Sequence, residues 1–374
     1  MNITTYESIN QVDEAEWNAI VGRDRLICRH EYLRGVEASR INDCRYFYPV
    51  LYKNGRIVAH ACLYFISTEL DSFAQGALKS GVEWMRRKWK TFMMLQSVEC
   101  GTPVALGNTI SIREGVDRVI VLGQIVGEAE RIARKLNVGV LLFRDFYDGE
   151  LGFYDKLSDF GYTRIENLPA AKLDIRWRTF EDYLCNMRSQ YRRIFRKRIA
   201  SFESEGGRIE VVKDFACHSD EMERLWMNAY NHAKEYRREV LKKDFFENMD
   251  KFLGSRSAAI IATLNGSMVG FSLLLIDDET LVTLFCGLDY SYSKDYYIYF
   301  NLFYEAIRYA ISCGCRKIDL GITTLVPKLE LGADVVTLNM YMKHLNPLLN
   351  LVVPRLFRLM TPKQVPETRR VFSR

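Results

Sequence analysis

The chain has 374 residues, of which 48% are hydrophobic and 26% charged, and its formal net charge is +5. This length allows two domains with cores of their own, and the composition is typical of a globular protein rather than a disordered or fibrous one. The mildly basic balance does not by itself indicate a nucleic-acid partner.

The first half predicts a helical segment with a break near Gly22, then a β-hairpin, a strand, a helix and another strand. These elements are expected at residues 13–39, 47–66, 94–100, 116–136 and 138–143. The hairpin turns at Asn54-Gly55, a pair that tolerates the positive φ of a two-residue turn. A basic and aromatic insertion at residues 67–90 separates the hairpin from the next strand.

The second half repeats this pattern about 210 residues later, with a hairpin turning at Asn265-Gly266. Its elements are expected at residues 258–276, 281–288, 295–313 and 317–320. A basic helix over residues 179–207 and a strand over 208–213 precede them, and an apolar tail interrupted by prolines follows at 345–360. Thr179, with Asp182 three residues on, predicts the start of the basic helix, and Gly206-Gly207 predicts its end.

This order of elements excludes a doubly wound nucleotide-binding fold, and no phosphate-binding glycine motif is present. It predicts an α+β protein of two tandem domains, residues 1–168 and 169–374. Each domain is expected to hold a mixed, mostly antiparallel sheet flanked by helices.

Nine cysteines are scattered along the chain without a Cys-x-x-Cys pair, which is typical of a reducing compartment. The N-terminus has no signal-peptide pattern, and no run of 18 apolar residues predicts a membrane-spanning helix. We therefore expect a cytoplasmic protein. Five histidines without ligand-like spacing predict no metal site.

The repeated order resembles the GNAT acyltransferase fold. Residues 187–212, in which a helix rich in Arg and Lys leads through glycines into a strand, are similar to Fem-type aminoacyltransferases and related double-GNAT proteins. Residues 296–321, a long helix followed by an Asp-x-Gly strand end, and residues 327–336 resemble the segments that follow in that family. In the first half, the segment around Tyr154 resembles the closing helix and strand of ordinary GNAT domains.

The resemblance implies acyl transfer to an amine, with Tyr154 as a possible acid and with Asp319 and Lys328 as the residues that the family pattern marks. A structural ion pair between Asp319 and Lys328 is the alternative. Ordinary GNAT enzymes hold coenzyme A phosphates with a glycine-rich loop, but the equivalent loop here, residues 288–299, has no glycine. The donor is therefore either an acyl-CoA or an aminoacyl-tRNA, and no tightly bound cofactor is expected.

Several residues near the predicted strand ends are candidates for the donor site. Cys286 and Gly287 could line a donor channel, or the cysteine could pack as a small buried hydrophobe. Asp289, Tyr292 and Tyr296 follow the strand; they could contact the donor, or Asp289 and Tyr292 could cap the following helix.

Two polar residues on first-half strands are candidates for proton transfer and substrate binding. Glu99 lies in an apolar strand, where burial would raise the pKa of its carboxyl and make it a base, unless it faces solvent. His60 could contact the substrate, or it could be a satisfied core histidine.

Arg188, Arg192 and Arg196 share one face of the basic helix, which suits a polyphosphate, a nucleotide-linked substrate or a tRNA backbone. A solvated face is the alternative. The insertion at 67–90 and the tail at 345–360 combine apolar and basic residues, as in helices that lie on a membrane surface, although core packing, a lid or an oligomer contact would also fit.

We therefore expect an N-acyltransferase that moves an acyl group from an acyl-CoA to a small-molecule amine acceptor by direct attack. A Fem-type transferase using aminoacyl-tRNA is the first alternative. A GNAT-like binding module without catalysis is the second. The sequence does not predict an oligomeric state.

Overall fold

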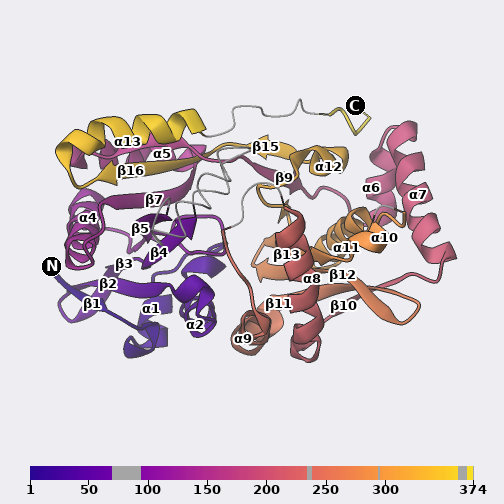
Figure 1. The fold of residues 1–374 in the computed structure, drawn as a ribbon, viewed down its shortest axis with the longest axis horizontal. Coiled ribbons are helices and arrows are strands. Elements are labelled where there is room, and N and C mark those ends of the chain that lie inside the picture. The colour runs from indigo at the N-terminus through magenta and orange to yellow at the C-terminus, as the bar shows by residue number, and fades with distance from the viewer. Residues whose placement is uncertain (70–93, 234–237, 294, 361–368, 374) are drawn as a thin grey trace, which may run out of the picture.

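The computed structural model describes residues 1–69, 94–233, 238–293, 295–360 and 369–373 of the chain. Two β-sheets flanked by helices lie side by side, one in each half of the molecule (Figure 1). The predicted α+β fold class of two tandem domains is confirmed. Residues 67–69 of the predicted insertion belong to a strand, and residues 70–90 lie outside the described ranges.

The first sheet has nine strands. They are β1 (Asn2–Tyr6), β2 (Arg45–Lys53), β3 (Arg56–His60), β4 (Leu63–Glu69), β5 (Met94–Cys100), β6 (Ser111–Ile112), β7 (Val140–Tyr147), β8 (Thr163–Glu166) and β16 (Leu338–His344). β3 and β4 continue one another along β2, β5 pairs with β4, and β7 lies parallel to β5.

The second sheet has seven strands in the order β10, β11, β12, β13, β14, β9, β15. Their bounds are β9 (Ala170–Asp174), β10 (Arg208–Val212), β11 (Ser257–Leu264), β12 (Ser267–Asp277), β13 (Thr280–Leu288), β14 (Lys317–Asp319) and β15 (Asp334–Val336). All neighbours are antiparallel except β13 and β14, which are parallel.

The helices of the first half are α1 (Glu14–Asn18), α2 (His30–Ala38), α4 (Arg118–Lys135) and α5 (Asp148–Tyr154). Those of the second half are α6 (Phe180–Asn186), α7 (Ser189–Ser204), α8 (Ser219–His232), α9 (Lys243–Leu253), α10 (Tyr290–Ser293), α11 (Ile298–Ser312), α12 (Leu325–Glu330) and α13 (Pro347–Met360). α4 and α11 are the crossover helices that join the parallel strand pairs β5–β7 and β13–β14.

Both predicted hairpin turns are confirmed. Asn54 and Asn265 have φ of 52° and 51°, and the glycines that follow them have φ of 75° and 80°. Two consecutive residues with positive φ match the right-handed twist of the flanking strands, which explains the Asn-Gly pair in each hairpin.

The basic segment predicted as a single helix over residues 179–207 is two helices, α6 and α7. Thr179 and Asp182 form the expected capping box at the start of α6. The backbone is extended at Met187, which forms an isolated β-bridge with Phe372 near the C-terminus. The tertiary pairing of Met187 therefore overrides a helical pattern that looked continuous.

One strand crosses between the halves of the chain. β16 comes from residues 338–344, yet it lies in the first sheet between β7 and β8. α13 follows it and packs on the same domain (Figure 1). The C-terminal part of the chain thus completes the first sheet before the segment Arg369–Ser373 returns to the second domain.

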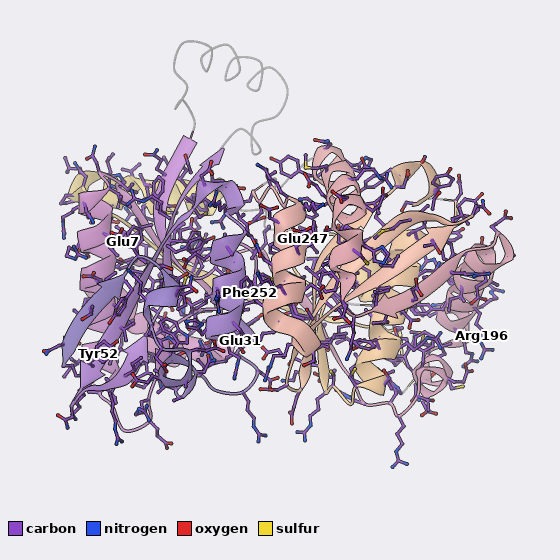
Figure 2. All side chains as sticks on the ribbon, turned by 90° about the horizontal axis from the view of Figure 1, so that it is seen from below. Glu7, Glu31, Tyr52, Arg196, Glu247 and Phe252 are labelled. Atoms are coloured by element: carbon purple, nitrogen blue, oxygen red, sulfur yellow. The ribbon has the colours of Figure 1, made fainter. Side chains whose placement is uncertain are left out.

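The two domains share a hydrophobic core cluster that contains Trp17 and Tyr48 from the first and Phe246 and Phe271 from the second. Helices α2 and α9 meet at Gly35, where an added Cβ would lie 2.7 Å from Cε of Met249. Phe252, at this junction in Figure 2, lies under the guanidinium of Arg34 at 4.9 Å. Continuous burial across the junction indicates that the domains form one folding unit.

Candidate active site

Two parallel strands of the second sheet, β13 and β14, part from one another beyond a short paired stretch. β13 and β14 pair from Thr280–Lys317 to Val282–Asp319, and β13 then continues to Leu288 without β14 beside it. The register between β12 and β13 also shifts after Leu273, so Leu284 is a bulged residue. In the first sheet, by contrast, β5 stays paired with β7 to its last residue, Cys100.

Lys328 is a buried charged side chain near the point where these strands part. It lies on α12, is only 3% exposed, and an added Cβ on Gly321 would lie 3.7 Å from its Nζ. Burial lowers the pKa of Lys328 to about 8, while the nearby Cys286 and Asp319 oppose that shift. A lysine with such a pKa exchanges its proton close to neutral pH, which an exposed lysine does not.

Cys286 lies on the part of β13 that pairs with β12 but not with β14, close enough to Lys328 for each to affect the other's pKa. Burial raises the pKa of the Cys286 thiol to about 11, although the charge of Lys328 lowers it. A thiol with this pKa is protonated at neutral pH and is a poor nucleophile. Tyr299 of α11 and Tyr290 of α10 also lie near Cys286. Burial raises the pKa values of both tyrosines, and a thiolate at Cys286 would raise them further.

Asp319 connects the two domains. Its carboxylate accepts hydrogen bonds from the hydroxyl of Tyr147 at the end of β7 (3.3 Å) and from the backbone N–H of Gly321 (2.9 Å). Lys172 of β9 lies 3.4 Å from the same carboxylate, and its Nζ is 3.6 Å from the centre of the Tyr147 ring. Asp319 therefore pairs with Lys172, and no direct ion pair with Lys328 is present among the described residues.

Gly287 allows a helix to approach the sheet. An added Cβ would lie 2.3 Å from Cε1 of Phe271 and 2.6 Å from the backbone carbon of Leu225 in α8. The close approach at this glycine is made by α8 and by the ring of Phe271.

Substituting Gly287→Ala is expected to destabilise the fold by about 1–3 kcal/mol, because α8 and Phe271 must move to admit a methyl group. Urea unfolding measures this loss. Gly127→Ala in α4 is the control, since a Cβ there meets nothing within 4 Å. Equal stability of both variants would contradict the packing role of Gly287.

The loop between β13 and α11 is held by its own side chains. Asp289 accepts a hydrogen bond from the backbone N–H of Ser291 (3.1 Å) and lies 3.9 Å from Arg224. Tyr292 is exposed and stacks with Tyr296 at 6.3 Å between ring centres. Asp289 thus stabilises the turn into α10, while the two tyrosines are accessible to a ligand.

Glu99 does not have the protonation behaviour predicted from the sequence. Its carboxylate accepts hydrogen bonds from Tyr64 (2.6 Å) and Ser97 (2.7 Å), and it pairs with Arg238 (2.6 Å) and Arg144 (3.2 Å). Burial raises the pKa of Glu99, but the two arginines and the hydrogen bonds prevail and lower it to about 2. The prediction of a raised pKa is wrong, so Glu99 is an ion-pair partner and not a base at neutral pH.

His60 and Tyr154 are parts of the first-domain core. His60 is fully buried, its ring stacks on Trp17 at 3.6 Å, and its Nε2 lies 3.2 Å from the carbonyl oxygen of Trp17. Tyr154 packs on Phe146 and donates a hydrogen bond to Asn108 (3.4 Å). These contacts correspond to the core alternative for His60, and they place Tyr154 in the first sheet's core rather than beside Lys328.

His60 is expected to make the fold sensitive to acid. Burial lowers the pKa of its imidazole from 6.5 to about 3, with the nearby Arg25 charge adding to the effect. Between pH 6.5 and about 3, His60 is protonated in the unfolded chain but neutral in the folded protein. The free energy of unfolding therefore falls as the pH falls below 6.5. From about pH 7 to about pH 5 the loss from this group is about 2 kcal/mol. Urea unfolding should show a smaller loss over this range for His60→Phe, and an equal loss would exclude His60 as the cause.

The three arginines of the basic segment do not form one free cationic face. Arg192 donates to the carbonyl oxygens of Cys185 (3.1 Å) and Met187 (3.3 Å), where α6 ends. Arg196 pairs with Glu181 and lies at the outer side of the second domain in Figure 2. Arg188, the residue before α7, lines a groove with other arginines.

This groove has a volume of about 740 Å³ and is formed by the ends of β9 and α6 together with the C-terminal segment. Its lining includes five arginines and three aspartates: Arg176, Arg178, Arg188, Arg369, Arg370, Asp174, Asp182 and Asp334. Trp177 and Phe372 pack together on its apolar side, with ring centres 4.8 Å apart.

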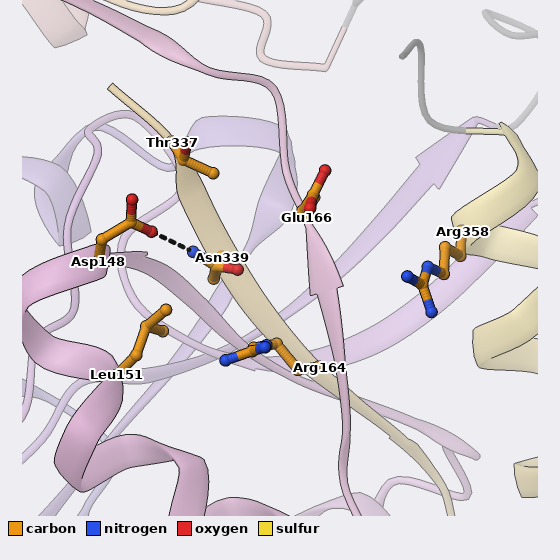
Figure 3. Close-up of a pocket in the computed structure, with 7 residues that line it drawn as sticks. All are labelled: Asp148, Leu151, Arg164, Glu166, Thr337, Asn339 and Arg358. Carbon is orange, nitrogen blue, oxygen red and sulfur yellow. Dashed lines mark hydrogen bonds between the residues drawn. The ribbon is translucent and has the colours of Figure 1, made fainter. Parts of the chain in front are cut away.

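A smaller cavity of about 290 Å³ lies in the first domain between α5, β8, β16 and α13 (Figure 3). Arg164 and Arg358 line it with two acids, Asp148 and Glu166, and Asp148 accepts a hydrogen bond from Asn339 (3.1 Å). Its charges balance, and none of the predicted site residues lines it. In the described part of the chain, no group of three or more His, Cys, Asp or Glu side chains could hold a metal ion.

Sequence reasoning missed three residues of the site: Tyr147, Lys172 and Tyr299. Tyr147 ends β7, four residues beyond the strand predicted at 138–143, and its contact with Asp319 spans 172 residues of sequence. Tyr299 belongs to a helix rich in aromatic residues, where no local pattern separates a core tyrosine from one beside Cys286. A polar residue at a strand end was the only available signal for Tyr147.

Comparison with known families agrees with this architecture. Residues 8–324 match a family model described as FemAB-like, peptidoglycan biosynthesis/recognition. The chain belongs to the FemAB-like family. Its fold is that of a tandem GNAT protein, with one sheet in each half.

Related proteins share the fold at low sequence identity. The structure of FemX is similar over 95% of this chain and 100% of that chain, with a TM-score of 0.60 and 11% identity. A tandem GNAT protein from the clavulanic acid biosynthesis pathway is similar over 92% of this chain and 99% of that chain, with a TM-score of 0.52 and 12% identity.

A curated relative extends well beyond the region shared with this chain. A putative 8-amino-7-oxononanoate synthase 2 of Mycobacterium tuberculosis is 26% identical over 323 residues, which are 84% of this chain. The chain spans only 42% of the length of that relative.

None of the helices in the described part of the chain is long and apolar enough to cross a membrane.

Proposed function

We propose that this FemAB-like protein is an acyltransferase that moves an acyl group from the thioester of an acyl-CoA to an amine acceptor, by direct attack at the point where β13 and β14 part. The observation that supports this proposal is the parting of the two strands beside the buried Lys328. Beyond Val282, no strand of the described residues pairs with β13 on that side. The peptide N–H groups of β13 on that side are therefore available to stabilise the oxyanion of a tetrahedral intermediate.

The chain's own residues supply the proton transfers. The amine nitrogen attacks the thioester carbonyl carbon, and the C–S bond breaks as the intermediate collapses. Lys328 donates a proton to the departing sulfur and then accepts the proton that the new amide nitrogen loses, which restores its charge. A pKa of about 8 lies close to that of an ordinary thiol, so both transfers are nearly balanced.

The donor and acceptor would enter from different sides. The N-terminus of α11 has no side-chain cap, so its free N–H groups and positive dipole end can hold donor phosphates, next to Tyr292 and Tyr296. The acceptor amine would approach from the junction of the domains, where Tyr147 and Lys172 surround the carboxylate of Asp319. That carboxylate orients both groups.

Binding and turnover with acetyl-CoA test the proposal. We expect acetyl-CoA to raise the melting temperature of the protein in a concentration-dependent way. Mass spectrometry should detect acylated product when candidate amines are added. A protein that neither binds acyl-CoA nor releases free thiol from it would contradict an acyl-CoA donor.

One observation favours aminoacyl-tRNA as the second candidate donor. The arginine groove joins several guanidinium groups to the indole of Trp177, and such a surface fits an RNA backbone with a stacked base. Arg178, Arg188 and Arg370 have no ion-pair partner among the described residues, unlike Arg176, which pairs with Asp174 (3.4 Å).

Salt-dependent binding of aminoacyl-tRNA separates the two donors. If aminoacyl-tRNA is the donor, its affinity for the protein should fall steeply as the salt concentration rises. The triple variant Arg178→Gln, Arg188→Gln and Arg370→Gln should reduce the slope of log K against log salt concentration by about 3. Arg134→Gln, at an exposed arginine of α4, is the control. Unchanged binding in the triple variant would exclude this groove as the RNA site.

A further inference from the structure

Helix α13 exposes an unusual amount of apolar surface. Eleven large apolar residues are exposed in the described part of the chain, and five of them lie on this one helix: Leu348, Leu349, Leu351, Val352 and Leu356. They are between 46% and 75% exposed. Single exposed leucines are ordinary, but five on 14 residues form a patch that requires a partner.

The patch is not required by the fold of the domain. The inner side of α13 presents Val353 and Phe357 to a small cluster of buried residues on β7, β8 and β16. Figure 1 shows the helix along the outer edge of the first domain, next to β16 and α5. Within the described part of the chain, the outward side of the helix is therefore exposed to solvent.

The charges of the helix match an anionic surface. α13 has no Asp or Glu, and its two charged residues, Arg355 and Arg358, are both exposed. Arg358 also lines the cavity in Figure 3, which contains Glu166. Aliphatic side chains flanked by arginines are typical of a helix that lies in the plane of a bilayer.

One feature favours a lipid surface over a second protein, and another shows that the helix would lie on such a surface. Protein interfaces concentrate aromatic residues at their centre, whereas the only aromatic residue of α13, Phe357, is turned inward. The helix has 14 residues, about 21 Å in length, which is too short to span a hydrocarbon core of about 30 Å.

We propose that α13 docks this protein onto anionic membrane surfaces, with the leucine side chains inserted at the level of the headgroups and the arginines paired with lipid phosphates. The helix lies on the bilayer and does not cross it. This inference does not depend on the identity of the acyl donor.

Vesicle flotation of the full chain tests the proposal. We expect the protein to float with mixed phosphatidylcholine–phosphatidylglycerol vesicles and to bind phosphatidylcholine vesicles more weakly. Leu348→Asn, Leu351→Asn and Leu356→Asn combined should lower the partition coefficient by more than about tenfold. Val119→Asn with Ile120→Asn, at exposed apolar residues of α4, should leave it unchanged.

A second variant tests the electrostatic part. Arg355→Gln with Arg358→Gln should remove most of the preference for anionic vesicles, by about tenfold or more, while weak binding to neutral vesicles persists. All changed side chains are exposed, and circular dichroism melting checks that each variant folds. Wild-type protein that stays with neither vesicle type would overturn the proposal. So would a dimer in sedimentation that the leucine variant dissociates, since a second copy would then cover the patch.

Discussion

Substituting Lys328→Met is expected to lower kcat/KM for acyl transfer by about 10²–10⁴-fold, because the buried ammonium is the proton donor and acceptor of the proposed reaction. Methionine retains the length and burial of the side chain, so folding should persist. Steady-state rates with acyl-CoA and an amine acceptor measure the effect. Lys317→Met, at an exposed lysine on β14, is the matched control and should retain full activity.

The pH dependence of the same residue gives an independent result. Burial lowers the pKa of Lys328 from 10.5 to about 8. The rate that depends on its proton should therefore fall as pH rises through about 8. Between these two values the unfolded chain binds the proton more strongly than the folded chain, so the lysine adds stability as pH rises, up to about 3 kcal/mol. Lys328→Met should show neither effect, and a variant that keeps both pH profiles would exclude Lys328 from the reaction.

Substituting Glu99→Ala is expected to destabilise the protein by about 3–5 kcal/mol, because two buried guanidinium groups lose their shared carboxylate. Arg238 and Arg144 are 11% and 6% exposed, so water cannot replace the lost partner. Denaturant unfolding at neutral pH measures the loss. Since Arg238 belongs to the second domain, the junction between domains should loosen as well, which hydrogen exchange around β5 would detect.

An exposed ion pair provides the comparison for Glu99. Glu221→Ala removes the partner of Arg224, a pair in which both side chains are about half exposed, and should cost less than about 1 kcal/mol. Similar losses for Glu99→Ala and Glu221→Ala would show that the buried cluster is not an essential part of the junction. Any loss of activity in Glu99→Ala should follow its loss of folded protein, since the carboxylate is not a base.

The elements that depend on neighbours in sequence were predicted well. The two Asn-Gly turns and the capping box at Thr179 have the expected geometry, because φ preferences and capping bonds act within a few residues. The family resemblance rested on the order of such elements, and this order also predicted where β13 and its crossover helix α11 would lie. The prediction of a single helix over residues 179–207 is wrong, because Met187 pairs with the distant Phe372 and divides the segment into two helices.

The candidate site was only partly predictable, because its chemistry depends on residues brought together from both domains. The family resemblance predicts Lys328 and Asp319 as site residues. Tyr147 and Lys172 belong to the site only because the fold brings them to Asp319. Glu99 was recognised as buried, yet the sign of its pKa shift was wrong. The decisive ion pair, with Arg238, spans 139 residues of sequence, and no local pattern encodes it.

The sequence by itself determined the repeated architecture, its turns and the family of this protein, since these follow from periodicity and from side chains a few residues apart. Only the tertiary structure decided where β13 and β14 part, which sheet receives β16, and which buried groups are charged. The physical reason is that strand pairing, desolvation and Coulomb interactions depend on distance in space, and folding brings remote parts of the chain within a few ångströms of one another.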